Sequence, residues 1–71
     1  LENLNVINEQ NELLGIIDYV LPTGANDVLA VKPIAGSIDD KERLIPFLKQ
    51  EVIEKIELQD KTIYVKWPRD F

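Results

Sequence analysis

The chain has 71 residues with 13 acidic and 8 basic side chains, a net charge of −5, and neither cysteine nor histidine. A chain of this length forms one small domain, and without Cys and His it has no disulfide, no thiolate or imidazole zinc ligand and no histidine acid–base catalyst. The excess of acidic side chains disfavours binding to a phosphate backbone. It favours a basic protein partner, or it serves only to keep a small domain soluble.

Six apolar runs of the strand type alternate with polar, turn-like segments: residues 4–7, 13–21, 27–34, 42–48, 54–58 and 62–67. In the second run, Gly15 would weaken a helix by about 1 kcal/mol, whereas in a strand glycine often marks a bend or a bulge. In the fourth run, Pro46 cannot donate a ladder hydrogen bond, which places that strand at an edge or a bulge. These runs predict six short strands.

The last two runs alternate between polar and apolar side chains, which predicts one inward face on each strand. In the fifth run the alternation turns Ile56 and Leu58 inward. In the sixth run the inward residues are Ile63, Val65 and Trp67, and the outward residues are Thr62, Tyr64 and Lys66. We therefore expect Trp67 in the core and Tyr64 on the surface.

The connections contain residue types that favour turns. Asn11, in the first polar turn, tolerates the left-handed backbone region better than most residues. Between the second and third runs, Pro22 suits the end of a strand and Gly24 tolerates positive φ. Asn26 and Asp27 can hydrogen-bond their own backbone, so this stretch is predicted to be a loop between two strands.

Residues 35–40 form the longest connection and are predicted to be exposed and mobile. A metal site at Asp39 and Asp40 is disfavoured, because adjacent side chains in a flexible loop rarely converge on one ion. Residues 49–53 allow at most a short helical turn. Residues 59–61 turn the chain into its last run.

The pattern as a whole predicts an all-β fold, either a small six-stranded antiparallel barrel or two packed sheets. Closure into a barrel would remove exposed strand edges. No run approaches the roughly 20 apolar residues of a membrane span. The chain begins at Leu1 without an initiator methionine, so we expect residues 1–71 to be a single domain of a longer protein.

The residue types do not favour catalysis. Nucleophilic catalysis needs an activated side chain beside a base, and no histidine is present to activate the available hydroxyls: Thr23, Ser37, Thr62, Tyr19 and Tyr64. The acidic residues fall mainly in turns and on strand faces rather than as a catalytic pair. Residues 23–26 contain one glycine and open no helix, unlike a phosphate-binding loop. We expect no enzyme activity, no metal and no cofactor.

Binding is the better hypothesis. Arg43 has two interpretations: an ion pair with Asp27 or another nearby acid, or a charged anchor in an interface. Tyr64 is an amphipathic ring of the kind that is enriched at interface hot spots. The tail, residues 68–71, can pack back on the domain or lie free, and the sequence leaves both alternatives open.

Four segments in order resemble the C-terminal PRC-barrel half of RimM, a bacterial ribosome maturation factor that acts on the small subunit. They are Glu12-Leu13-Leu14-Gly15, Thr23-Gly24-Ala25-Asn26-Asp27-Val28-Leu29, Lys41-Glu42-Arg43-Leu44-Ile45-Pro46-Phe47 and Ile63-Tyr64-Val65-Lys66-Trp67. The resemblance spans nearly the whole chain. It implies a PRC-type β-barrel.

The resemblance also implies a function. RimM-like proteins are cytoplasmic chaperones of ribosome assembly: they bind the immature 30S subunit and assist 16S rRNA processing and assembly of the 30S head. The implied partner is the basic head protein numbered nineteen, with the domain a monomer that does not contact RNA on its own. The two central motifs and the amphipathic ring of Tyr64 indicate where the domain would bind protein. We therefore expect the protein-binding residues to be Gly24, Ala25, Asn26, Asp27, Arg43, Ile45, Pro46, Phe47 and Tyr64.

In this family an N-terminal barrel domain and a linker precede the PRC barrel, and an aromatic pair implicated in ribosome binding lies just ahead of the segment that starts here. A second interpretation is a structural PRC-barrel module of a membrane-associated complex, such as a photosynthetic reaction-centre subunit. The motifs at residues 23–27 and 42–46 favour RimM.

Overall fold

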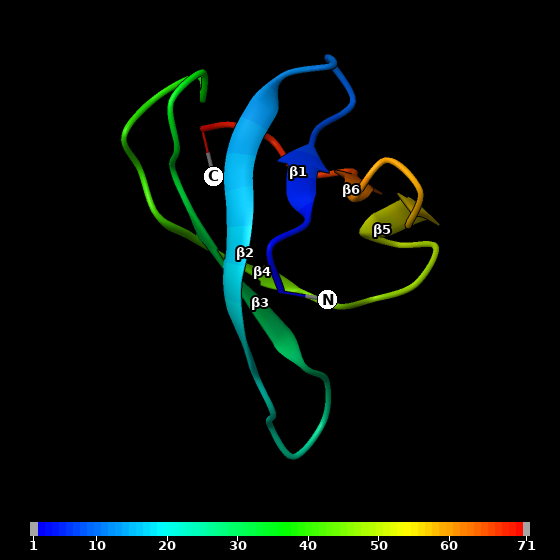
Figure 1. Ribbon diagram of the computed structural model, residues 1–71. Coiled ribbons are helices and arrows are strands. Elements are labelled where there is room, and N and C mark those ends of the chain that lie inside the picture. The colour runs from blue at the N-terminus through cyan, green and yellow to red at the C-terminus, as the bar shows by residue number, and fades with distance from the viewer. Residues whose placement is uncertain (1, 71) are drawn as a thin grey trace.

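The computed structural model describes residues 2–70, and this part of the chain forms six β-strands and no helix (Figure 1). The strands are β1 (Asn5–Ile7), β2 (Leu13–Leu21), β3 (Val28–Lys32), β4 (Arg43–Pro46), β5 (Ile53–Glu57) and β6 (Thr62–Val65). The prediction of an all-β fold with six strands is confirmed. β2 covers the predicted residues, β5 lies one residue earlier than predicted, and the other four strands are shorter than predicted.

All six strands belong to one sheet in the order β4-β3-β2-β1-β6-β5. The chain enters the sheet at β1 and pairs antiparallel outward through β2 and β3 to β4. It then crosses to the opposite edge, where β5 and β6 form an antiparallel pair that returns to β1. The returning β6 runs parallel to β1. The predicted antiparallel pairing is thus correct except at this pair.

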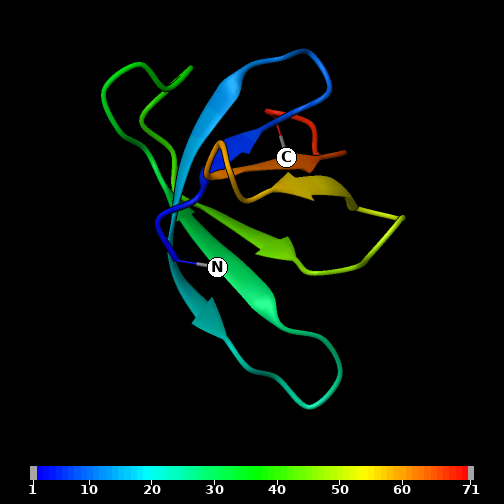
Figure 2. The same cartoon turned by 45° about the vertical axis from the view of Figure 1, so that its right-hand side comes forward.

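The sheet coils, but its two ends do not close a barrel, so the expectation of closure was wrong. Figure 2 shows β2, β3 and β4 as one half of the fold and β1, β6 and β5 as the other. In residues 2–70, β4 and β5 are the two edges and do not pair with each other. The β4 edge ends at Pro46, which has no N–H to donate, as predicted for an edge strand.

A hydrogen-bonded turn takes the chain from one edge to the other. The N–H groups of Val52 and Ile53 both donate to the carbonyl of Leu48 at 2.9 Å and close a tight turn, where at most a short helical turn was predicted. Gln50 has a φ of 73°, which prevents continuation into a helix. Asn11, in the first turn, has a φ of 63° and so adopts the left-handed conformation that the sequence predicts.

The core lies between the two halves of the sheet and takes side chains from every strand. Its buried apolar residues are Leu4, Val6, Leu14, Ile17, Leu29, Val31, Ile45, Val52, Ile53, Ile63 and Val65. Trp67 and Ile56 are partly buried and pack against these residues. This agrees with the prediction that both side chains face inward.

The predicted facing was wrong for Leu58, and Thr62 is covered although it faces outward as predicted. Leu58, expected inward, is 69% exposed, because β5 ends at Glu57 and Leu58 already belongs to the following turn. Thr62, expected to face outward, is buried, and its hydroxyl donates to the carbonyl of Asp60 at 2.9 Å. A small side chain on a strand between two neighbours is covered by them even on the outer face.

Gly15 lies where β2 bends, next to an irregularity in its pairing with β1. Its φ is 149°, and a Cβ at this position would lie 2.1 Å from the backbone carbonyl oxygen of Lys32. Only glycine allows β2 and β3 to approach this closely. The structure thus has an irregularity at Gly15, where a bend or a bulge was predicted.

Candidate functional site

The fold brings the two central sequence motifs together. Residues 23–27 connect β2 to β3, and β4 pairs with β3 so that Val28 lies opposite Pro46. The N–H of Phe47 donates to the carbonyl of Asp27 at 2.8 Å, which extends this pairing by one residue. The loop and the end of β4 therefore form one continuous surface at the tip of the β2–β3 hairpin, at the bottom of Figure 1.

Thr23 organises the β2–β3 loop. Its hydroxyl oxygen accepts hydrogen bonds from the N–H of Asn26 at 3.0 Å and of Ala25 at 3.3 Å, and its hydroxyl donates to the carbonyl of Asn26. A threonine side chain that bonds nearby backbone groups fixes a turn locally. Residues 22–27 are all exposed. The loop is thus a locally hydrogen-bonded, accessible projection.

The other predicted site residues are not all on this surface. Ile45 is fully buried in the core, and Phe47 packs against that core while remaining partly exposed. Pro46 is half-buried at the edge. Tyr64 is half-buried on β6, in the other half of the sheet, with the Lys55 ammonium 4.8 Å from its ring centroid. The structure therefore does not place Tyr64 beside the β2–β3 loop.

Arg43 is buried, with only 2% of its side chain exposed, and its ion-pair partner is Asp39 rather than Asp27. The guanidinium donates to both carboxylate oxygens of Asp39, at 3.1 and 2.7 Å, and also to the backbone carbonyl of Arg69 at 2.7 Å. Arg43 therefore ties residues 35–40 and the C-terminal tail to β4. The tail packs back on the domain as far as Asp70; Phe71 lies outside the described residues.

The connection between β3 and β4, expected to be mobile, is held at several points. The N–H of Ile38 donates to the carbonyl of Leu13 at 3.0 Å, and the Ile38 side chain packs against the core. The Ser37 hydroxyl oxygen accepts from the N–H of Ile34 at 2.9 Å. The carboxylate of Asp39 is held by Arg43, and among residues 2–70 no group of three or more Asp or Glu side chains is placed to hold a metal ion.

The Arg43 guanidinium lowers the pKa of Asp39 from 3.8 to about 2, and the N–H of Lys41 contributes to the shift. A carboxyl group whose pKa is lower in the folded than in the unfolded state stabilises the fold above its unfolded pKa. This stabilisation is lost as the pH falls from the unfolded value of 3.8 through the folded value of about 2.

Asp39→Asn should therefore be less stable than the parent chain at neutral pH, and the difference should shrink as the pH approaches 2. Urea unfolding of both chains at several pH values checks this, because the other acidic residues are common to both chains and cancel in the difference. A difference that stays constant down to about pH 2 would contradict the role assigned to the Arg43–Asp39 pair.

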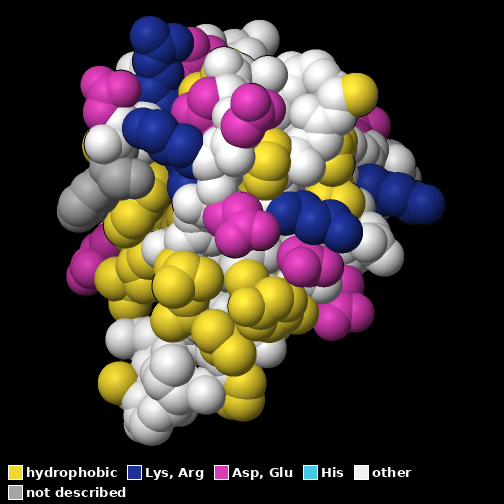
Figure 3. All heavy atoms as spheres, turned by 90° about the vertical axis from the view of Figure 1, so that its left-hand side faces the viewer, with side chains coloured by type: hydrophobic (Ala, Val, Ile, Leu, Met, Phe, Trp, Pro, Cys, Tyr) yellow, Lys and Arg dark blue, Asp and Glu magenta, His cyan; other side chains and the backbone are white. Residues whose placement is uncertain are grey.

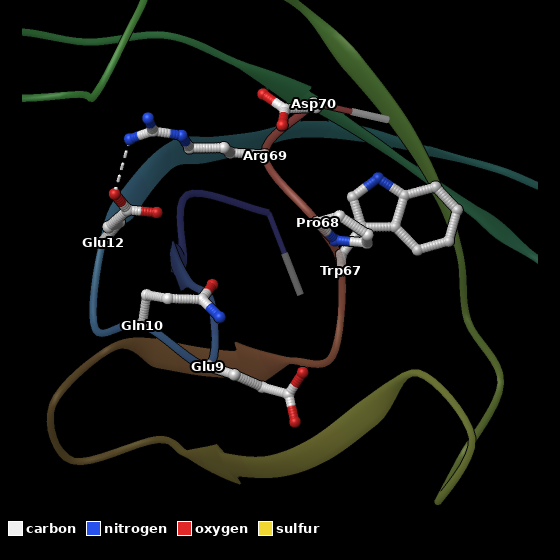
Figure 4. A pocket seen from close by; sticks show the side chains of 7 residues that line it. All are labelled: Glu9, Gln10, Glu12, Trp67, Pro68, Arg69 and Asp70. Carbon is white, nitrogen blue, oxygen red and sulfur yellow. Dashed lines mark hydrogen bonds and ion pairs between the residues drawn. The ribbon is translucent and has the colours of Figure 1, made fainter.

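A hollow of about 500 Å³ lies between the β1–β2 turn and the tail (Figure 4). Arg69 reaches from the tail to the carboxylate of Glu12 at 2.8 Å. The remaining charged side chains of the wall are Glu9 and Asp70. The wall thus has an excess of negative charge, which disfavours an anionic ligand. The sequence did not indicate this hollow, because it depends on the packing of the tail.

The outer face of β2, β3 and β4 is apolar, which the sequence analysis missed. Side chains of directly paired residues point to the same side of a sheet, and two such rows cross these strands: Tyr19, Ala30 and Leu44, and Leu21, Val28 and Pro46. We call these six residues the outer patch. Figure 3 shows apolar side chains gathered on one face of the molecule.

The signal for the outer patch was present in the sequence. Tyr19 and Leu21 alternate with inward residues, and Leu44 and Pro46 are out of phase with buried Ile45. The runs that contain these residues are apolar on both faces of the strand.

The fold and this surface define a small all-β domain that offers an exposed loop beside an apolar strand face. A family model described as the RimM PRC barrel domain matches residues 1–71, and the chain belongs to that family. The family resemblance that was inferred from the sequence motifs is therefore confirmed. Within residues 2–70 the structure has no helix that is long and apolar enough to cross a membrane.

Several relatives are similar over all 71 residues. The ribosome maturation factor RimM of Pseudomonas fluorescens Pf0-1 is 51% identical, and that of Pseudomonas aeruginosa PAO1 is 52% identical. The match covers 39% and 40% of these two proteins, so the chain spans about two fifths of their length. A crystal structure of the 16S ribosomal RNA processing protein RimM from P. aeruginosa superimposes with a TM-score of 0.96 at 51% identity, over 100% of this chain and 43% of that one.

Proposed function

We propose that this domain is a non-catalytic, protein-binding part of a cytoplasmic ribosome maturation factor. It binds the immature 30S subunit through the head protein numbered nineteen, and it thereby assists 16S rRNA processing and assembly of the 30S head. The domain does not bind RNA on its own.

The membership of the whole chain in the RimM PRC barrel family is the observation that supports this proposal most strongly. The relatives are named as ribosome maturation factors, and the similar crystal structure as a 16S ribosomal RNA processing protein. The net charge of −5 supports a basic protein partner, because opposite charges favour association and speed encounter. The same charge disfavours direct binding to RNA.

The proposed contact surface is the exposed loop from Gly24 to Asp27 together with the adjoining Pro46 and Phe47. Arg43 and Ile45 support this surface from inside, since both side chains are buried. Tyr64 lies in the other half of the sheet and is proposed as a separate contact.

A titration of the isotope-labelled chain with the purified head protein numbered nineteen, followed by NMR at moderate salt, tests the proposal. We expect amide shifts to cluster at residues 24–27 and 43–47. The same titration with a fragment of 16S rRNA should leave the spectrum unchanged. A folded chain that shows no shifts with the head protein would overturn the proposed partner.

A further inference from the structure

The outer patch contains a small hollow with an apolar floor and a charged rim. Ala30 is only 6% exposed although it lies outside the main core cluster, because Tyr19 and Leu44 flank it on the neighbouring strands. The hollow has a volume of about 50 Å³. Binding pockets for small molecules usually measure roughly 300–1,000 Å³, so this hollow fits one side chain of a larger partner.

The apolar walls of the hollow are accessible. Tyr19 is 44% exposed, Leu21 40% and Leu44 61%. In contrast, the alternate residues of the same strands are in the core. Large apolar side chains that are adjacent and exposed on one face mark an interaction surface more often than isolated ones do.

The rim of the hollow has an excess of negative charge. Its charged residues are Asp18, Lys32, Glu42 and Arg43. The guanidinium of Arg43 is already paired with the carboxylate of Asp39 at 2.7 Å, so it does not offset the charge of the rim. Asp18 and Lys32 form an ion pair at 3.5 Å and offset each other. Glu42 is exposed, and it takes part in none of the ion pairs found within residues 2–70. The hollow therefore combines apolar walls with one uncompensated carboxylate.

We propose that the outer patch docks a segment of a basic protein in which a Lys or Arg lies next to an apolar side chain. The aliphatic stem of the Lys or Arg lies between Tyr19 and Leu44, and its charged end lies beside Glu42. The apolar neighbour covers Leu21 and Pro46. This inference rests on the proposed function and specifies the chemistry by which its partner is recognised.

The same observations disfavour other occupants. RNA would bring phosphates towards Glu42, which repels them. A second copy of this chain in a symmetric dimer would place the same patch against itself and bring the two Glu42 side chains to one interface. A basic protein segment satisfies both the apolar walls and the carboxylate.

Two pairs of matched variants test the proposal by calorimetric titration with the head protein numbered nineteen. Leu44→Ser removes an apolar wall, and Leu58→Ser changes an equally exposed leucine in the turn after β5. Glu42→Lys reverses the charge of the rim, and Glu54→Lys makes the same change on β5. We expect each patch variant to weaken binding about tenfold or more, and each control to stay within about twofold.

The outcomes separate this inference from the proposed function. An equal affinity for the head protein in all four variants would overturn the docking role of the outer patch and leave the partner established. Failure of the unmodified chain to bind would overturn the proposed partner and this inference with it. Tighter binding by Glu42→Lys would show that the ligand is acidic and overturn the inference. So would a concentration-dependent dimer that is lost only in Leu44→Ser, because it would assign the patch to a second copy.

Discussion

Replacing Gly15 with alanine should destabilise the domain strongly and remove a large part of its free energy of unfolding. The new methyl group would lie 2.1 Å from the backbone carbonyl oxygen of Lys32, and this oxygen cannot move away without separating β2 from β3. The φ of 149° adds backbone strain for any residue with a side chain. We expect a loss of about 4 kcal/mol, against a total stability of roughly 4–10 kcal/mol for a chain of this size.

Thermal unfolding followed by circular dichroism measures this effect, with Gly24→Ala as the matched control. A Cβ at Gly24 would have no atom within 4 Å. The control should therefore keep its melting temperature within about 5 °C of the parent chain, because a compatible Gly-to-Ala change is worth less than about 1 kcal/mol. A Gly15→Ala variant that melts as the parent does would show that β2 and β3 tolerate a wider separation.

Much of the fold follows from local patterns in the sequence. The apolar runs locate all six strands, Pro46 indicates an edge strand and Gly15 indicates a bend, because each of these signals acts on its own segment. The pairing of β1 with β6 does not follow from such signals. It joins segments that are more than fifty residues apart, and its parallel direction depends on how the chain crosses from β4 to β5.

The candidate site was predictable only in part. The sequence identified the loop at residues 23–27 and the segment that forms β4 as candidates, since both lie in recognisable motifs. It did not show that Ile45 and Arg43 point inward, because burial of a charged residue depends on partners elsewhere in the chain. The partners of Arg43 are Asp39 and the Arg69 carbonyl, and the second is 26 residues away. Leu58 shows the converse: a shift of one residue in the end of β5 moves an apolar side chain into solvent.

The two arginines of the chain should differ greatly in their importance for stability. Arg43→Ala removes a buried guanidinium that bonds Asp39 and the Arg69 carbonyl, and it leaves a gap in the interior beside β4. Removing one partner of a buried ion pair is costly, and we expect a loss of about 3 kcal/mol. Arg43→Lys should recover only part of this loss, because an ammonium group cannot make the bidentate contact with Asp39.

Arg69→Ala is the matched control, because the Arg69 side chain is 58% exposed and its ion pair with Glu12 lies at the surface. Such a pair contributes about 0–1 kcal/mol, and the backbone carbonyl that binds Arg43 is retained. Urea unfolding gives the stabilities, and fluorescence of the single Trp67 reports on the tail. If Arg43 fastens the tail, its variants should shift the Trp67 emission below the unfolding transition, whereas Arg69→Ala should not. Equal losses in the two alanine variants would mean that the tail is held by the packing of Trp67 and that the buried guanidinium is dispensable.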